Sequence, residues 1–169
     1  IWLTKSYKNI DLLTRYKALG LMNPILILQN GIGQSGIFKD ILGDDVALFE
    51  GVTSQAAKLK RPGYVVNNGA GDLLISPNPL LELIFSESDI QFVVVKDIQK
   101  EKLNKLAINA VLNPVTALFK VSNGEALNGE AKQSILQLIN IVFPFFKKRG
   151  IFKSEESFFK AVQKIAKQT

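Results

Sequence analysis

Three polar side chains recur at intervals of four residues in one otherwise apolar segment: Lys105, Asn109 and Asn113. A helix turns by about 100° per residue, so a step of four moves only about 40° around its axis and the three side chains share one stripe. The apolar character of the remaining residues predicts a buried helix. Because a buried charge or amide without a partner is costly, we predict that the stripe faces a cleft and binds a polar, anionic ligand.

A turn earlier in the chain is the second candidate site. Residues 30–33 read Asn-Gly-Ile-Gly and follow an apolar run at 24–29, which predicts a strand covered on both faces, as in a parallel sheet. Open α/β sheets bind ligands at the carboxyl ends of their strands, where glycine lets the backbone approach closely and Asn30 offers a donor and an acceptor. Taken by itself, the motif also fits an ordinary Asn-Gly turn.

Three other polar positions have simpler explanations. Lys5 ends a predicted first strand, where it could contact a cofactor phosphate or ribose or simply lie at the surface. Asn123 precedes a predicted helix start, and helix capping alone would explain it. The glycine-rich segment 67–72 is predicted to be a structural turn, since turn chemistry accounts for its residues.

The composition excludes several kinds of chemistry. The chain has 169 residues, of which 47% are hydrophobic, and it contains no cysteine and no histidine. Disulfides, thiol nucleophiles, histidine-based triads and nearly all zinc sites are therefore excluded, and no metal site is predicted. A net charge of +6 slightly favours anionic partners. The basic clusters lack interleaved aromatic residues, so we expect no nucleic-acid partner, and no apolar run is long enough to predict a membrane span. We expect a cytoplasmic protein.

The hydrophobic pattern changes near residue 96. The first part alternates strands and helices, which predicts an α/β layer. Its expected elements are a strand at 1–5, a helix at 9–19, strands at 24–29 and 45–52 with a helix at 33–42 between them, a hairpin of 64–66 with 73–75, a helix at 79–85 and a strand at 90–95. The second part is helical, with expected helices at 97–119, 125–148 and 154–167.

Individual residues refine the helical part. Pro114 is expected to break or kink the first of its helices and to free the Ala110 carbonyl, while Ser154 is expected to cap the last one. The chain begins inside what reads as a parallel strand, whose edge would lack a partner. We therefore expect a fragment of a longer polypeptide.

The segment 105–127, KLAINAVLNPVTALFKVSNGEAL, resembles the helix signature of the ketopantoate reductase (2-dehydropantoate 2-reductase) family. Three further segments match that family in the same order along the chain: WLTKSY at 2–7, ILILQNGIG at 25–33 and GVTSQAAKLKRPGYVVNNGAGDLLIS at 51–76. The resemblance covers nearly all of the chain.

The resemblance implies a specific two-domain organisation. Residues 1–96 would form a partial Rossmann-type NADP-binding domain that lacks its first βαβ unit. Residues 97–169 would form an all-helical substrate and dimerisation domain, similar to the C-terminal domain of 6-phosphogluconate dehydrogenase, that lacks its C-terminal part. The active site would lie in the cleft between the domains, and a homodimer is allowed.

The resemblance also implies residue roles and an activity. Lys105 would be the general acid that protonates the carbonyl oxygen of ketopantoate, an α-keto acid, as NADPH delivers hydride. Substrate-binding residues would be Asn30, Asn109, Asn113 and Asn123, and cofactor-binding residues would be Lys5, Asn30 and Ala57. The product would be pantoate, in the route to pantothenate and coenzyme A. An ammonium beside a developing alkoxide stabilises the charge and supplies the proton, so the chemistry agrees with the stripe.

The sequence departs from the family pattern in several places. The opening phosphate loop, G-x-G-x-x-[GA], is not matched, and Gly31-Ile32-Gly33 does not take its place. Leu103, Gln55 and Ser76 stand where the family usually has tryptophan, histidine and glycine. We expect these 169 residues to be inactive by themselves. The alternative is a paralogue without enzymatic activity that uses the fold as a protein- or RNA-binding scaffold, although such a scaffold would not need the polar stripe.

Overall fold

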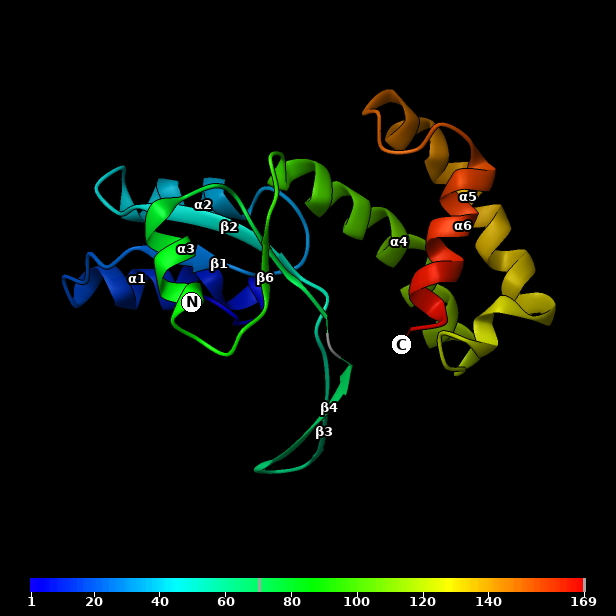
Figure 1. Cartoon of the computed structure of the whole chain (residues 1–169), viewed down its shortest axis with the longest axis horizontal. Coiled ribbons are helices and arrows are strands. Elements are labelled where there is room, and N and C mark those ends of the chain that lie inside the picture. Colours follow the sequence, from blue (N-terminus) through cyan, green and yellow to red (C-terminus); the bar gives the residue numbers. More distant parts are fainter. Residues whose placement is uncertain (70, 169) are drawn as a thin grey trace. The chain divides into compact units, whose positions relative to one another are not determined.

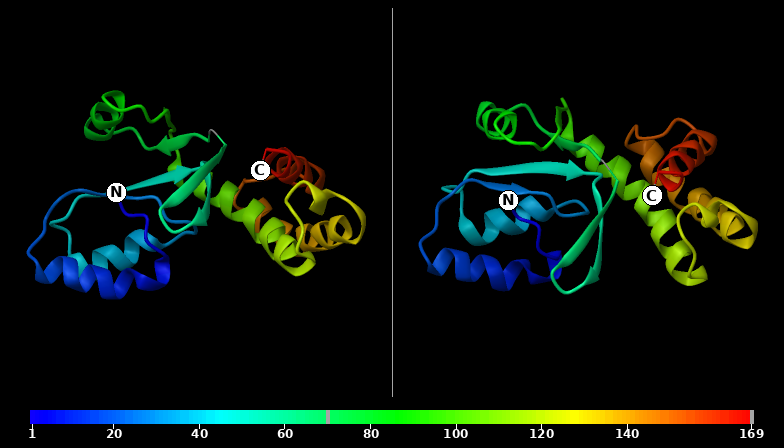
Figure 2. Two further views of the ribbon diagram at one scale, coloured as in Figure 1. Left: turned by 90° about the horizontal axis from the view of Figure 1, so that it is seen from below. Right: turned by 60° about the horizontal axis from the view of Figure 1, so that its bottom comes forward.

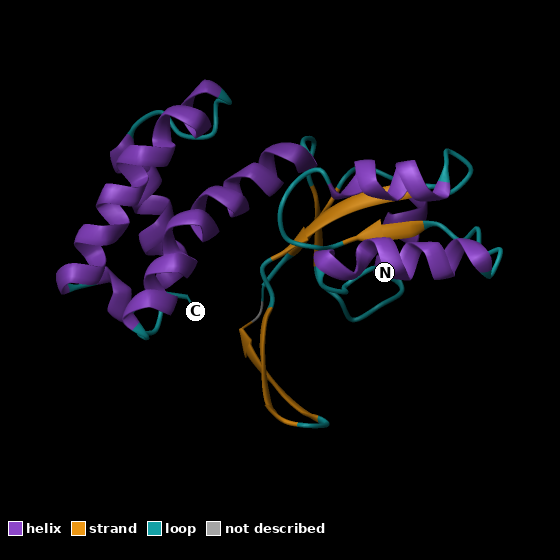
Figure 3. Cartoon of the chain, turned by 180° about the vertical axis from the view of Figure 1, so that it is seen from behind, coloured by secondary structure: helices purple, strands orange, loops and turns teal. Residues whose placement is uncertain are grey.

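The computed structural model describes residues 1–69 and 71–168 (Figure 1). Contacts within the chain divide it into two compact units. The first unit comprises residues 1–55 and 71–102, and the second comprises residues 56–70 and 103–169. The prediction that an α/β part is followed by a helical part is confirmed, as the colouring by secondary structure shows (Figure 3).

The first unit is built on a sheet in the order β1-β2-β5-β6. Its strands are β1 (Ile25–Ile27), β2 (Leu48–Thr53), β5 (Leu73–Ile75) and β6 (Phe92–Val94), and its helices are η1 (Ser6–Lys8), α1 (Asn9–Ala18), α2 (Gln34–Leu42) and α3 (Pro79–Ser86). The β1–β2 and β5–β6 pairs are parallel, whereas β2 and β5 are antiparallel. The sheet is therefore mixed, with its parallel pairs on either side of one antiparallel contact.

Helices cover both faces of this sheet. Ile25 and Ile27 pack with Leu13 of α1 and Phe38 of α2, while Leu26, between them on β1, packs with Leu81 of α3. Successive side chains of a strand point to opposite faces, so β1 contributes to both cores. All three β1 residues are buried, which confirms the strand predicted from the continuous apolar run.

The predicted first strand is reduced to one bridge. Trp2 pairs with Ile27 in parallel, with its N–H donating to Leu26 O at 2.8 Å and its carbonyl accepting from Leu28 N at 3.2 Å. The segment around Trp2 therefore runs beside β1 in the same direction. The residues that follow the bridge reach the edge of the sheet at which β1 also ends.

The predicted hairpin of residues 64–66 with 73–75 is wrong. Instead, β4 (Tyr64–Gly69) pairs with β3 (Ala56–Arg61) in a separate two-stranded sheet, visible as an extended ribbon in both views of Figure 2. Its turn is Pro62-Gly63, with Gly63 at φ 76°, which suits the second central position of a type II turn. This dipeptide is the turn signal that the prediction overlooked. The predicted turn at 67–72 includes Ala70, which lies outside the described residues.

Gly71 marks a close approach of two backbones. β5 lies antiparallel to β2, and just beyond the paired residues Asp72 N donates to Ser54 Oγ at 2.9 Å and Ser54 N donates to Asp72 O at 3.0 Å. A Cβ at Gly71 would overlap the carbonyl group of Ser54 and the nitrogen of Gln55. Only glycine fits here without a shift of the backbone.

The helical elements are α4 (Ile98–Phe119), η2 (Glu125–Leu127), α5 (Gly129–Lys148) and α6 (Glu155–Ala166). The boundary between the units falls inside α4, after Lys102. α4 is one continuous helix that includes Pro114, so of the predicted break or kink there the break is wrong and the kink stays a prediction. The predicted helix at 125–148 is divided at Asn128 into η2 and α5.

One core holds the helices of the second unit together. Ala107, Val111 and Val115 of α4 are buried with Ile135 of α5 and Phe158 of α6. The predicted cap of α6 is confirmed, because Ser154 Oγ accepts from Ser157 N at 3.1 Å. Among the described residues, no helix has the length and apolarity needed to cross a membrane.

Candidate functional site

The polar stripe of α4 turns away from most of the core of its own unit. Ala107 follows Lys105 by two residues, which is about 200° around the helix, so the buried row of Ala107, Val111 and Val115 lies nearly opposite the stripe. Lys105 and Asn109 are half-buried and Asn113 is exposed. The prediction that the whole stripe is buried is therefore wrong. Of the flanking apolar residues, Leu112 is buried although it lies about 20° from Lys105 around the helix, whereas the stripe becomes exposed at Asn113.

Partial burial changes the acidity of Lys105. Desolvation lowers the pKa of this ammonium below its usual value, because water no longer fully stabilises the charge. A lower pKa makes a lysine a better proton donor near neutral pH than an ordinary surface lysine. Its position on a helix with two amides on the same stripe gives it neighbours able to orient a bound carboxylate or hydroxyl group.

Asn123 lies in the turn between α4 and η2. Ser122 and Glu125 close this turn reciprocally: Ser122 N donates to Glu125 Oε2 at 2.8 Å, and Glu125 N donates to Ser122 Oγ at 3.3 Å. Ser122 N, and also Ser122 Oγ at 2.8 Å, donate to Glu125 Oε2, and these two bonds to the carboxylate lower the pKa of Glu125. Ser122 therefore makes reciprocal bonds in the turn where the sequence suggested that Asn123 would cap.

In the first unit, Lys5 and Asn30 follow two parallel segments. Lys5 comes shortly after the Trp2 bridge and Asn30 shortly after β1, and both side chains are exposed. Because parallel strands end at one edge of a sheet, the two residues follow the same edge, where α/β sheets bind ligands. Ala57 is placed elsewhere, in β3, where it is exposed and pairs with Asn67.

Glycines shape the loop that carries Asn30. Gly31 has φ 92° and Gly33 has φ 79°, a region that residues with a side chain rarely adopt. Gly36 completes the spacing G-x-G-x-x-G, in which the third glycine normally allows close packing of helix and strand. A Cβ at Gly36 would meet nothing within 4 Å, so close packing does not require this glycine. The spacing alone therefore identifies no phosphate site.

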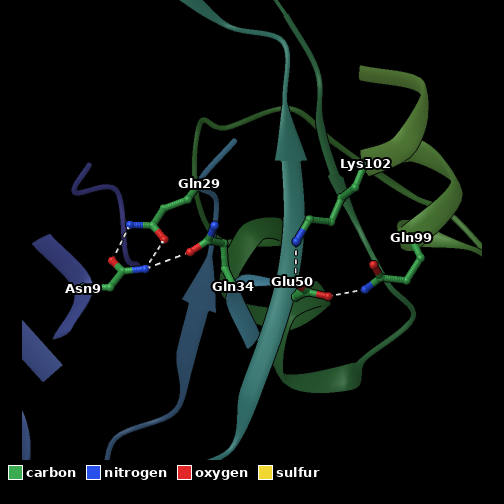
Figure 4. A network of polar contacts seen from close by, with 6 residues as sticks. All are labelled: Asn9, Gln29, Gln34, Glu50, Gln99 and Lys102. Carbon is green, nitrogen blue, oxygen red and sulfur yellow. Dashed lines mark hydrogen bonds and ion pairs between the residues drawn. The ribbon is translucent and has the colours of Figure 1, made fainter. Parts of the chain in front are cut away.

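A buried ion pair was not anticipated from the sequence. Lys102 is 3% exposed and its Nζ contacts Glu50 Oε1, while Gln99 Nε2 donates to Glu50 Oε2 (Figure 4). Both partners belong to the first unit. The contact holds the first turns of α4 against β2, three residues before Lys105. A carboxylate at Glu50, inside a predicted strand, was the available signal.

The described residues contain no group of three or more acidic side chains arranged to hold a metal ion. The candidate groups are an ammonium with amides in the second unit and, separately, an amide with a lysine at the sheet edge of the first unit. Such groups recognise anions and hydroxyl groups and can move one proton.

Comparison with known proteins gives consistent matches. Residues 1–80 match the family model "Ketopantoate reductase PanE/ApbA", and residues 97–169 match "Ketopantoate reductase PanE/ApbA C terminal". A 2-dehydropantoate 2-reductase of Pyrococcus horikoshii is 31% identical over 140 residues, which cover 78% of this chain and 46% of that protein. The chain spans about half the length of the curated relatives it matches.

Solved structures agree with these matches. The crystal structure of a probable 2-dehydropantoate 2-reductase from Bacillus subtilis is 28% identical and has a TM-score of 0.71, covering 99% of this chain and 58% of that chain. A PanE/ApbA family ketopantoate reductase from Ralstonia eutropha has a TM-score of 0.81 at 20% identity, covering 98% of this chain and 56% of that chain. The second likeness shows a shared fold.

Proposed function

Because the chain belongs to the ketopantoate reductase family, we propose that the whole protein reduces 2-dehydropantoate to pantoate with NADPH. The two matched family models and the 2-dehydropantoate 2-reductases among the relatives support this substrate. The expected Rossmann-type first domain and helical second domain agree with the same family assignment. The structural observation that carries the proposal is the stripe of Lys105, Asn109 and Asn113, which turns away from most of the core of its unit.

We assign the proton transfer to Lys105. A dinucleotide, when bound, would supply a hydride to the carbonyl carbon, and the electron pair of the carbonyl bond would move to the oxygen. Lys105 Nζ donates the proton that converts this oxygen into the hydroxyl of the product, which leaves a neutral amine that regains a proton from water. Before transfer, the ammonium also attracts the substrate carboxylate, so one side chain serves binding and chemistry.

The amides have positioning roles in this proposal. Asn109 and Asn113 continue the stripe from Lys105 and would hold the carboxylate and hydroxyl groups of the substrate, together with Asn123. Asn30 would contact substrate and cofactor, and Lys5 and Ala57 would contact NADPH. These residues fit a dinucleotide. Lys5 offers a positive charge to a phosphate or ribose. Gly31 and Gly33, which have positive φ angles, place no side chain between the backbone and a ligand.

The test is a spectrophotometric assay of the whole protein. NADPH absorbance is followed with ketopantoate, with other short α-keto acids, and with NADH in place of NADPH. We expect turnover, with ketopantoate and NADPH as the preferred pair, and no turnover by the 169 residues alone. A folded whole protein that neither binds NADPH nor consumes it would contradict the proposal and favour the scaffold alternative. The proposal includes a cytoplasmic enzyme of the route to pantothenate and coenzyme A, able to form a homodimer.

The lowered pKa of Lys105 predicts the pH dependence of the reaction. A general acid acts only while protonated, so kcat/KM should fall as the pH rises through the pKa of Lys105. Because burial lowers that pKa, the decrease should begin at a lower pH than an ordinary lysine would give. Measuring kcat/KM between about pH 6 and pH 11 locates the decrease, a range chosen to include the usual pKa of lysine. The same decrease in the residual activity of Lys105→Ala would show that another group causes it.

A further inference from the structure

One buried amide connects three segments of the first unit. Asn9, the first residue of α1, is 1% exposed. Its Oδ1 accepts from Trp2 Nε1 at 3.1 Å. Its Oδ1 also accepts from Gln29 Nε2 at 2.7 Å, and its Nδ2 donates to Gln29 Oε1 at 2.9 Å and to Gln34 Oε1 at 3.0 Å, as Figure 4 shows. A side-chain amide can accept two hydrogen bonds and donate two. Every hydrogen-bonding position of Asn9 is therefore occupied.

Two of these partners bracket the loop that carries Asn30. Gln29 immediately precedes the loop at 30–33, and Gln34 immediately follows it as the first residue of α2. Asn9 thus holds both ends of a four-residue loop. The positive φ angles of Gly31 and Gly33 then define the path between the ends. Fixed ends and a fixed path leave the backbone of Asn30 little freedom of position.

The same network extends toward Lys5. Gln29 is 8% exposed and its Nε2 also donates to the carbonyl of Thr4 at 2.5 Å. Thr4 is the residue immediately before Lys5. The reciprocal pair of amides, Asn9 with Gln29, therefore fixes the backbone next to both residues that are proposed to contact the cofactor in this unit.

We propose that Asn9 is a positioning residue for the dinucleotide site: it holds the Asn30 loop and the backbone before Lys5 in the geometry that binds the cofactor. The assignment of a cofactor to these residues rests on the proposed function. That Asn9 holds the loop does not rest on the proposed function, because it follows from the hydrogen bonds alone.

The variant Asn9→Asp tests this proposal with little change in shape. A carboxylate keeps the two acceptor positions for Trp2 and Gln29 but cannot donate, so it turns the contacts with the two glutamine oxygens into repulsion. Asn23→Asp is the matched control, since it makes the same change at an exposed position of the same unit. Gln34→Met removes only the hydrogen bond between Asn9 Nδ2 and Gln34 Oε1 at the end of the loop. It is the milder variant to use if Asn9→Asp does not fold.

Hydrogen–deuterium exchange without any ligand gives the first readout. We expect backbone amides of residues 30–34 to exchange about tenfold faster in Asn9→Asp, a factor typical of the loss of one or two net hydrogen bonds. β1 and β2 should keep their protection, and Asn23→Asp should match the wild type. Unchanged exchange at 30–34, or an equal increase throughout the unit, would overturn the positioning role.

NADPH binding to the whole protein gives the second readout, measured by fluorescence titration of the folded protein. Asn9→Asp should raise Kd for NADPH about tenfold, and Gln34→Met by a smaller factor, since it removes one hydrogen bond. A purely structural role would lower the unfolding midpoint and leave Kd of the folded protein unchanged. If the wild type binds no NADPH, the proposed function and the cofactor role fail, and the exchange experiment still decides whether Asn9 holds the loop.

Discussion

Replacing Lys105 with alanine in the whole protein should lower kcat for ketopantoate reduction by about 10²–10⁴, the usual contribution of a positioned general acid. The residue is half-buried, its pKa is lowered by desolvation, and it shares a stripe with two amides that turn away from most of the core. Because the substrate carboxylate also loses its partner, KM should increase as well. Steady-state kinetics with NADPH and ketopantoate measure both effects.

Two further lysine variants separate charge from proton transfer. Lys105→Arg keeps a positive charge but, because the pKa of a guanidinium is far higher than that of an ammonium, donates a proton poorly, so it should retain more of the substrate affinity than of kcat. Lys100→Ala removes an exposed lysine from the same helix and should leave both constants unchanged. Full activity of Lys105→Arg would show that the charge suffices and that another group supplies the proton.

Local periodicity in the sequence was enough to predict which polar side chains share one side of a helix. The spacing of Lys105, Asn109 and Asn113 predicted one stripe of a helix, and the structure has them on α4. The direction of the stripe required knowledge of which side the helix buries. Apolar residues occur around most of α4, so the sequence did not show that Asn113 would be exposed although it correctly indicated that Ala107 and Val111 face the core.

The pairing of segments that lie far apart in the chain could not be predicted from the sequence. β5 could have paired with β4 or with β2, since both are short and apolar, and only the Pro62-Gly63 turn favours the observed β3–β4 hairpin. The Asn9 network joins residues 20 and 25 positions apart. No local pattern marks such amides, because their buried positions follow from the packing of α1 and α2 on the sheet rather than from their neighbours in the chain.

Replacing Lys102 with methionine should destabilise the first unit by about 3–5 kcal/mol, the cost of leaving one charge of a buried pair without its partner. Lys102 and Glu50 have side chains that are 2% and 10% exposed, so little solvent would reach the carboxylate left behind. Urea unfolding measures the loss. Trp2, the single tryptophan of the chain, packs edge-on against Phe38 with ring centroids 5.2 Å apart, so its fluorescence reports on this unit.

A double variant tests whether the loss of stability comes from the unpaired charge at Glu50. Lys102→Met with Glu50→Gln removes both charges, and an amide at position 50 can still accept from Gln99; much of the lost stability should therefore return. Lys100→Met, at an exposed lysine of the same helix, should change stability by less than about 0.5 kcal/mol. A loss in Lys102→Met no greater than in this control would mean that Glu50 is solvated.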